Sequence, residues 1–515
     1  MRTKLSLAMI SVIALSLSAI AAEKKPNIVV ILADDLGYGD VKAYNPQGKI
    51  ATPNLDKLAA SGLAFTDAHT PSAVCSPTRY GLMTGRYCWR SPLKSGVLGG
   101  LSPRLIEPNR ATLAQMLKDQ GYSTACVGKW HLGMDWVVKP GKEITRYNIE
   151  PVAQVNNVEY DKPTKNGPNS VGFDYFFGIS ASLDMVPYTF IENDRVTVNP
   201  TSEKAFLMAD DRPNGGKTRK GPAAPAFEAA DVLPTLTKKA VEVIATHKQE
   251  KPLFLYLPLA SPHTPIALSP AFRGQSKLNA YADFVMQTDV AVGEVLAALE
   301  KAGMTNDTLV VFTSDNGCSP QADFPTLLKA GHDPSAGFRG TKADIFEGGH
   351  RVPFIVKWPA AIKPGTTDRL TGLTDIYRTC AAVIGTTLPD TAAEDSISFA
   401  SAWGTGEGNR SNIVHHSING SFAIRKDNWK LCLCPGSGGW SAPRPGKDDA
   451  TKLPPVQLFD LATDSAEKVN LQDKHPEIVA ELTKLLEVQV AEGRSTPGKP
   501  QANTTAVDIR KAGGK

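Results

Sequence analysis

The segment Asn27-Ile28-Val29-Val30-Ile31-Leu32-Ala33, followed directly by Asp34-Asp35, decides the fold of this chain. The run is apolar almost throughout and shows no alternation with polar residues. A run of this kind is typical of a strand buried on both faces of a parallel sheet. In open α/β sheets, ligands bind at the carboxyl ends of the strands. The two aspartates therefore predict a ligand site just beyond this strand.

Strands and amphipathic helices alternate along the following part of the chain. Continuous apolar runs predict further strands at 123–127, 253–257 and 309–313. Helices are predicted from Thr52-Pro53 to Gly62, over 111–120, and over 281–299, where apolar residues recur at helical spacing. This alternation indicates an α/β fold with a large, mostly parallel sheet flanked by helices.

The character of the sequence changes after about Pro389. Turns rich in Gly, Pro and Asn separate short candidate strands at 413–416, 421–424, 429–433 and 456–459, and an amphipathic helix follows over 476–490. We therefore predict a main α/β domain over 23–388 and a smaller C-terminal subdomain with an antiparallel sheet over 389–495. Residues 496–515, rich in Gly, Lys and Thr, are expected to be disordered.

The first 22 residues resemble a targeting segment rather than part of the fold. Arg2 and Lys4 precede the apolar run LSLAMISVIALSLSAIAA, which ends in small residues. This pattern is typical of a secretory signal peptide cleaved near Ala21 or Ala22. A single N-terminal membrane anchor is the alternative, because the run is nearly long enough to span a bilayer. The small-residue end favours cleavage, so we expect an exported, periplasmic or secreted protein without a stable membrane anchor.

Composition excludes several classes of protein. The 515 residues are 42% hydrophobic and 21% charged, which excludes coiled-coil, collagen-like and disordered chains. The formal net charge is only +4, with acids and bases mixed throughout and no long basic stripe. We therefore expect no nucleic-acid partner.

A second acidic group follows the predicted strand at 309–313. Asp315-Asn316-Gly317 stands where Asp34-Asp35 stands after the first strand. Oxygen side chains from two strand ends suit a hard divalent cation such as Ca²⁺ or Mg²⁺. Taken singly, each group is more typical of a turn or a helix cap, and their shared placement at strand ends supports a metal site about as well as it supports turns.

The segment Cys75-Ser76-Pro77-Thr78-Arg79, with Thr84-Gly85-Arg86 behind it, carries the most specific signal. A thiol at a helix N-terminus beside an arginine is expected to have a lowered pKa. The segment also resembles the maturation motif of the formylglycine-dependent type I sulfatases, in which a separate enzyme oxidises the cysteine to an aldehyde. Further segments match that family in the same order, from Asp34-Asp35 to the stretch Glu347-Gly348-Gly349-His350-Arg351-Val352-Pro353.

The resemblance implies an alkaline phosphatase-like fold and a metal site. The implied ligands are Asp34, Asp35, Asp315, Asn316 and the formylglycine formed from Cys75. Ca²⁺ is expected in preference to Mg²⁺. The implied maturation partner is a formylglycine-generating enzyme or an anaerobic sulfatase-maturating enzyme.

The resemblance also implies a reaction. One hydroxyl of the hydrated aldehyde attacks sulfur and leaves a sulfated enzyme, and proton loss from the second hydroxyl expels sulfate. Arg79 and Lys129 are expected to hold the hydrate, His131 to take its proton, and His263 to protonate the leaving alcohol. Lys342 is expected to contact the sulfate.

Substrate-binding residues are predicted on the loops next to these motifs, namely Ser182, Asp184 and His332, with Trp136 and Tyr188 as further candidates. The implied function is hydrolysis of a sulfate monoester on a sugar such as galactose or N-acetylgalactosamine, within a polysaccharide or glycosaminoglycan. Two alternatives stay open at this point. One is a phosphonate or phosphodiester hydrolase of the same superfamily, and the other is an unmodified, inactive homologue that binds sulfated glycans.

Overall fold

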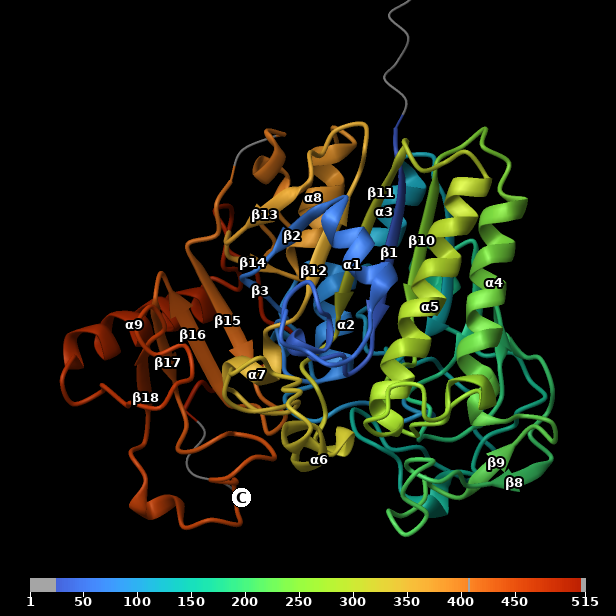
Figure 1. Ribbon diagram of the computed structural model, residues 1–515, viewed down its shortest axis with the longest axis horizontal. Coiled ribbons are helices and arrows are strands. Elements are labelled where there is room, and N and C mark those ends of the chain that lie inside the picture. Colours follow the sequence, from blue (N-terminus) through green and yellow to red (C-terminus); the bar gives the residue numbers. More distant parts are fainter. Residues whose placement is uncertain (1–24, 406–407, 511–515) are drawn as a thin grey trace, which may run out of the picture.

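The computed structural model describes residues 25–405 and 408–510. Within these residues a ten-stranded sheet crosses the molecule in the order β13-β2-β12-β11-β1-β10-β4-β5-β6-β7 (Figure 1). Its strands are β1 (Asn27–Ala33), β2 (Leu63–Phe65), β4 (Ser123–Lys129), β5 (Tyr175–Ile179), β6 (Ile191–Glu192), β7 (Arg195–Val196), β10 (Leu253–Pro258), β11 (Thr308–Ser314), β12 (Phe354–Lys357) and β13 (Gly365–Thr367).

The centre of this sheet is parallel, as the sequence predicts. β5, β4, β10, β1 and β11 all run in one direction, whereas β12, β6 and β7 pair antiparallel towards the edges. β1 pairs with β11 along its whole length, and Ala33 lies opposite Ser314. The residues that follow these two strands therefore emerge side by side at one edge.

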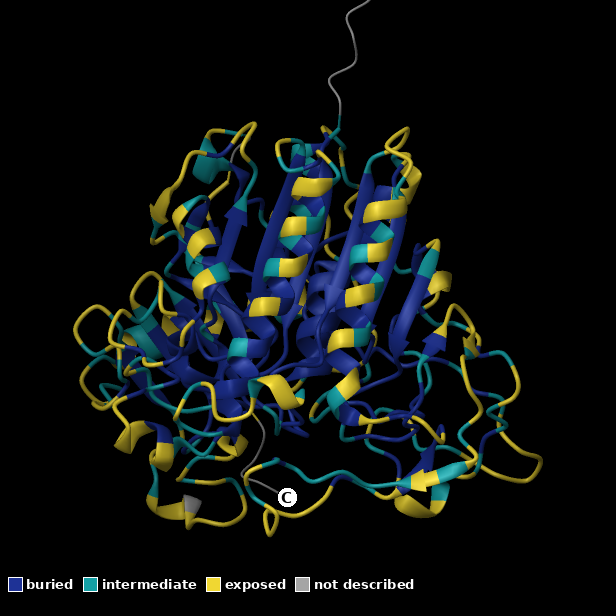
Figure 2. Cartoon of the chain, turned by 45° about the vertical axis from the view of Figure 1, so that its right-hand side comes forward, coloured by how far each residue is buried: buried dark blue, intermediate teal, exposed yellow. Residues whose placement is uncertain are grey.

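Helices cover both faces of the sheet. One face carries α1 (Pro53–Ala60), α4 (Val232–Thr246) and α5 (Ala280–Lys301), and the other carries α2 (Cys75–Thr84), α3 (Leu113–Asp119) and α8 (Asp375–Val383). β1 shows why both faces are needed, because Val29 and Ile31 join one apolar core while Ile28 and Val30 join the other. Figure 2 shows the same division, with buried strands inside and exposed residues along the outer sides of the helices.

A second, antiparallel sheet forms the C-terminal subdomain, as predicted. It consists of β15 (Asn412–His416), β16 (Phe422–Lys426), β17 (Trp429–Cys432) and β18 (Gln457–Asp460), with α9 (Pro476–Ala491) packed against it. In Figure 1 this sheet lies beside the large one, with α7 (Glu347–His350) near the junction. The smaller elements are β3 (Ala68–His69), β8 (Ser202–Lys204), β9 (Gly221–Ala223), β14 (Thr371–Gly372) and α6 (Phe324–Lys329).

The end of the chain differs from the expectation of disorder. Residues 496–510 run along the main domain, where the Thr504 amide donates to the Arg90 carbonyl (2.8 Å) and Arg86 Nη2 donates to the Ala502 carbonyl (2.9 Å). Hydrogen bonds to backbone groups need no apolar sequence pattern, so the composition of this segment did not reveal them. Residues 511–515 and the predicted signal peptide, residues 1–22, lie outside the described residues. Of the helices in the described part of the chain, none combines the length and the apolar composition that a bilayer crossing requires.

Candidate active site

The two acidic strand ends meet as the sequence predicts. The amide of Asp35 donates to Asp315 Oδ1 (3.3 Å), and Asn316 Nδ2 donates to Asp35 Oδ1 (2.7 Å). Asp35 has a φ of 65°, so the chain turns sharply just after β1. All three side chains, and that of Asp34, are buried. Four oxygen-bearing side chains thus converge where β1 and β11 end.

Cys75 lies against this group as the first residue of α2. Its Sγ is 3.6 Å from Asp34 Oδ1 and 3.6 Å from Lys342 Nζ. Burial raises the pKa of the Cys75 thiol, although the charges of Lys129 and Lys342 oppose this shift. The expectation of a lowered pKa is therefore wrong, because complete burial outweighs the neighbouring cations. A thiol held in its protonated form is a poor nucleophile.

Cationic side chains hold the buried carboxylates in place. Arg79 donates to Asp315 Oδ2 through Nε (3.0 Å) and Nη2 (2.7 Å), and through Nη1 to the Lys129 carbonyl (2.9 Å). Lys129 Nζ is 2.5 Å from Asp34 Oδ2. Lys342 Nζ is 2.6 Å from Asp35 Oδ1. Each of the three carboxylates thus has its own cation, and the centre is close to neutral.

The pKa values of two of these carboxyl groups are shifted in opposite directions. Burial alone would raise the pKa of Asp34, but the charges of Lys129, His263, Arg79 and Lys342 together hold it well below its usual range. Burial and the nearby charge of Asp34 raise the pKa of Asp315. Of these two carboxyl groups, Asp34 is therefore the more firmly ionised.

Two histidines contribute ring nitrogens with different roles. His131 Nε2 donates to the Leu98 carbonyl (2.8 Å), while its Nδ1 is buried and has no hydrogen-bond partner in the part of the chain that the structure describes. Burial, reinforced by the charges of Lys129 and Arg79, lowers the pKa of His131 well below its usual value. The ring is therefore neutral with an unused lone pair, which is the state that a proton acceptor needs.

His263 lies on the other side of the centre. Its Nδ1 is 2.5 Å from the Thr264 carbonyl, so this nitrogen carries the hydrogen, and its Nε2 is 3.3 Å from Ser182 Oγ and 3.7 Å from Asp35 Oδ2. Ser182 Oγ also accepts from Lys129 Nζ (2.7 Å). The Ser182 hydroxyl thus connects Lys129 to His263, the histidine expected near the leaving group.

The donor set fits a hard divalent cation. Ligand atoms of Asp34, Asp35, Cys75 and His263 all lie within 4.8 Å of one another. Asn316 Oδ1 is buried and has no hydrogen-bond partner among residues 25–405 and 408–510, although Nδ2 of the same amide is bonded. A buried amide oxygen without a partner is costly unless a cation or water meets it. Carboxylate and amide oxygens are the ligands that Ca²⁺ and Mg²⁺ take in proteins.

The predicted substrate-binding residues are divided between the centre and its surroundings. Ser182 is in the centre, and Asp184, two residues further on, has a buried Oδ1 that meets no hydrogen-bond partner among the described residues. His332 is held elsewhere, since its Nε2 contacts Asp40 Oδ1 (2.9 Å) and its Nδ1 accepts from the Lys49 amide (3.1 Å). With both ring nitrogens engaged and the side chain buried, His332 has no free group for a sugar.

The two aromatic candidates are likewise committed to the protein. Trp136 Nε1 donates to the Gly100 carbonyl (3.2 Å), and the Tyr188 hydroxyl bonds to Thr218 Oγ1 (2.9 Å). Leu98, whose carbonyl fixes the tautomer of His131, was not predicted from the sequence. A carbonyl contact between residues on different loops leaves no signal in residue type or spacing.

The fold and the centre define an α/β protein with a buried cluster of carboxylates and cationic side chains at the carboxyl ends of parallel strands. Residues 26–386 match the family model described as Sulfatase. The chain belongs to the sulfatase family and is a sulfuric ester hydrolase. This settles the enzyme class that the ordered motifs predicted.

Relatives support the assignment along most of the chain. The chain is 36% identical over 502 residues to an N-acetylgalactosamine-6-O-sulfatase of Bacteroides thetaiotaomicron, covering 90% of this chain and 93% of that protein. It is 30% identical to human arylsulfatase A, covering 88% and 85%. A solved structure from work on glycosaminoglycan metabolism by B. thetaiotaomicron superposes with a TM-score of 0.76 at 34% identity, covering 90% and 99%.

Proposed function

We propose that the enzyme removes sulfate from an O-sulfated sugar of a polysaccharide or glycosaminoglycan, with N-acetylgalactosamine 6-O-sulfate as the first candidate. The observation that carries this proposal is the likeness to the N-acetylgalactosamine-6-O-sulfatase, which extends over 90% of the chain. The centre supports it electrostatically. Its carboxylates and cations balance, so a bound divalent cation leaves a net positive site for an anionic ester.

The nucleophile is proposed to be formylglycine, made from Cys75 by a formylglycine-generating or anaerobic sulfatase-maturating enzyme. When present, the hydrated aldehyde supplies one hydroxyl to attack sulfur and a second whose deprotonation releases sulfate. The protonated, buried thiol supports this assignment, because an unmodified Cys75 is poorly suited to attack.

Asp34, Asp35, Asp315 and Asn316 would hold the metal, proposed to be Ca²⁺, which supplies charge stabilisation at the sulfate. His131 is proposed to accept a proton through its unpartnered Nδ1. His263 is proposed to donate one to the leaving alcohol through Nε2, acting as the imidazolium, in which Nδ1 keeps its hydrogen on the Thr264 carbonyl while Nε2 carries the transferred proton. Lys342 would face the sulfate from its position 3.6 Å from Cys75 Sγ.

Asp184 is proposed to bind a sugar hydroxyl, because its buried Oδ1 has no partner within the described residues. Residues 1–22 are proposed to direct export to the periplasm or the medium and then to be removed. Export would place the enzyme where polysaccharide substrates occur.

The test is sulfate release from a panel of monosulfated galactose and N-acetylgalactosamine isomers by protein co-expressed with a maturating enzyme. We expect release from the N-acetylgalactosamine 6-sulfate isomer, and none from the Cys75→Ala variant. Release from no sulfated sugar, together with hydrolysis of a phosphonate monoester or phosphodiester, would favour the other superfamily activity. Binding of sulfated sugars without turnover by fully matured protein would favour a glycan-binding protein.

A further inference from the structure

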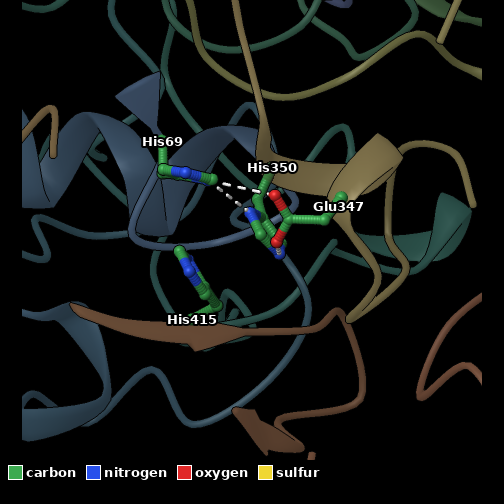
Figure 3. A group of neighbouring side chains, drawn as sticks. All are labelled: His69, Glu347, His350 and His415. Atoms are coloured by element: carbon green, nitrogen blue, oxygen red, sulfur yellow. Dashed lines mark hydrogen bonds and ion pairs between the residues drawn. The ribbon is translucent and has the colours of Figure 1, made fainter. Parts of the chain in front are cut away.

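A second buried polar cluster lies outside the catalytic centre, where the C-terminal subdomain meets the main domain. Figure 3 shows His69 from β3, Glu347 and His350 from α7, and His415 from β15 converging on one another. All four side chains are fully buried. Three imidazoles and a carboxylate are a donor set that suits Zn²⁺, so the first question is whether a cation is already present.

The ammonium group of Lys430, on β17, fills that role. Its Nζ is 3.0 Å from Glu347 Oε1, 2.9 Å from His350 Nε2 and 2.8 Å from Glu467 Oε1. Lys430 is fully buried, and the acidic partners Glu467 and Glu347 raise its pKa although burial opposes them. A metal ion on His350 and Glu347 would have to displace this ammonium.

The charges around the cluster also balance without a metal. Besides Lys430, the cations are Arg351, which donates to Glu347 Oε2 (2.9 Å), and Arg425, which donates to both oxygens of Asp67 (2.8 Å each). The carboxylates are Asp67 and Glu347, joined by Glu467 above its raised pKa of about 7. Burial lowers the pKa of His69, His350 and His415, so the three rings are neutral.

The shortest contacts at the two ends of the cluster, at Lys430 and at Asp67, set one direction for the hydrogen bonds. The contact of Arg425 Nη1 with His69 Nε2 would require the opposite direction, but at 3.4 Å it is longer than either of these. An ammonium group only donates, so His350 Nε2 must accept from Lys430 and the ring hydrogen must be on Nδ1. Nδ1 then donates to His69 Nδ1 (3.1 Å). This leaves the hydrogen of His69 on Nε2, where it donates to Asp67 Oδ1 (2.8 Å).

The opposite direction would place a donor against a donor at the Lys430 end and an acceptor against an acceptor at the Asp67 end. His350 Nε2–H could donate to the Ile345 carbonyl (3.2 Å), but it would then point at the ammonium of Lys430. An unprotonated His69 Nε2 would face the carboxylate of Asp67 at 2.8 Å. Lys430 at one end and Asp67 at the other therefore select the same tautomers.

This row of hydrogen bonds, from Lys430 to Asp67, is connected to the two loops that carry the proposed catalytic groups. Thr70 lies five residues before Cys75 in the first loop. Its amide donates to the His350 carbonyl (2.8 Å). Glu347 lies five residues after Lys342 in the second loop. Its amide donates to Glu467 Oε2 (2.6 Å). The two loops are joined directly, because the Ala343 amide donates to the Ala73 carbonyl (2.8 Å).

We propose that Lys430 is a positioning residue for catalysis, which fixes the tautomers of His350 and His69 and thereby the relative placement of the loops that carry Cys75 and Lys342. Its effect on turnover rests on the proposed sulfatase function, whereas the tautomers can be tested without substrate. Fixing the two loops matters because a small misplacement of reacting groups costs a large part of the rate.

The first experiment is heteronuclear NMR of the full mature chain labelled with ¹⁵N only at its nine histidines. We expect His350 as the neutral Nδ1–H tautomer, and His69 as the neutral Nε2–H tautomer, assigned with His350→Gln and His69→Gln variants. The Nδ1–H form is the less common tautomer of histidine in water, so its observation is diagnostic. An Nε2–H tautomer for His350, or metal-shifted resonances with zinc in the purified protein, would overturn the proposal whether or not the sulfatase function holds.

The second experiment measures kcat and KM of matured variants. The double variant Lys430→Met/Glu467→Gln removes one charge of each sign, and we expect kcat to fall about 10- to 100-fold with little change in KM. Lys426→Met, which removes a partly exposed lysine of the neighbouring strand β16 that is paired with Glu481 of α9, is the matched control and should leave both constants unchanged. A double variant that folds and stays within twofold of wild-type kcat would refute the positioning role.

A pair of substitutions at His350 keeps the test decisive if the double variant does not fold. The amide oxygen of His350→Gln can accept from Lys430 where Nε2 does, whereas His350→Leu cannot. We expect His350→Gln to keep at least five times the kcat of His350→Leu at similar KM. Equal kcat values for the two variants would contradict a role for the Lys430 contact.

Discussion

Replacement of Lys342 by Met removes one charge from the centre while preserving the length of the side chain. Lys342 is almost fully buried, and its Nζ lies 3.6 Å from Cys75 Sγ, which marks the position of the nucleophile. At an effective dielectric constant of about 20, a unit charge at this distance contributes about 5 kcal/mol to an anionic partner. Loss of one preorganised group of this kind commonly costs about 3–4 kcal/mol at the transition state.

We therefore expect Lys342→Met to lower kcat roughly 100- to 1,000-fold in a sulfate-release assay on matured protein. The same change should tighten Ca²⁺ binding measured by calorimetry, because Lys342 competes for Asp35 Oδ1 at 2.6 Å. Lys329→Met, at an exposed lysine of α6, is the control for loss of a lysine. A loss of kcat below tenfold, with normal folding and metal content, would refute the assigned role of Lys342.

Three further predictions concern stability. Arg79→Met should lower the free energy of unfolding by about 3–5 kcal/mol, because it leaves the Asp315 carboxylate buried without its cation; a loss under 1 kcal/mol in urea unfolding would count against this pairing. Removal of metal by a chelator should lower the melting temperature, and Ca²⁺ at about 1,000 times its Kd should restore about 4 kcal/mol; no shift with Ca²⁺ or Mg²⁺ would argue against the metal site. Burial raises the pKa of Glu467 from 4.5 to about 7, so the folded protein holds a proton that the unfolded chain releases, and stability should fall as the pH rises between these values. Glu467→Gln should remove this slope in unfolding curves at several pH values, and an unchanged slope would be inconsistent with the raised pKa.

The sequence predicts those parts of the fold that depend on residues close together along the chain, such as an apolar run and the polar residues next to it. The apolar run of β1 and the two aspartates that follow it locate the sheet centre and half of the buried acidic cluster within one short segment. The segment after β11 supplies the other half, and parallel pairing brings the two together. Residue type and position along a strand were sufficient for these features.

The remaining features depend on contacts between distant segments. His332 stands next to predicted motifs in sequence, yet Asp40 holds it away from the centre. The pKa of Cys75 is raised because the folded protein buries it completely, and burial at one position cannot be read from neighbours in sequence. Lys430 meets Glu347 and His350 only after the C-terminal sheet has packed against the main domain.

The measurement that tests the central claim most directly is the mass of the tryptic peptide containing residue 75, taken from protein co-expressed with a maturating enzyme. The account predicts a peptide lighter than the cysteine form by the difference between a thiol and an aldehyde side chain, in the same sample that releases sulfate. An unmodified cysteine in a sample with full sulfatase activity would contradict the formylglycine mechanism.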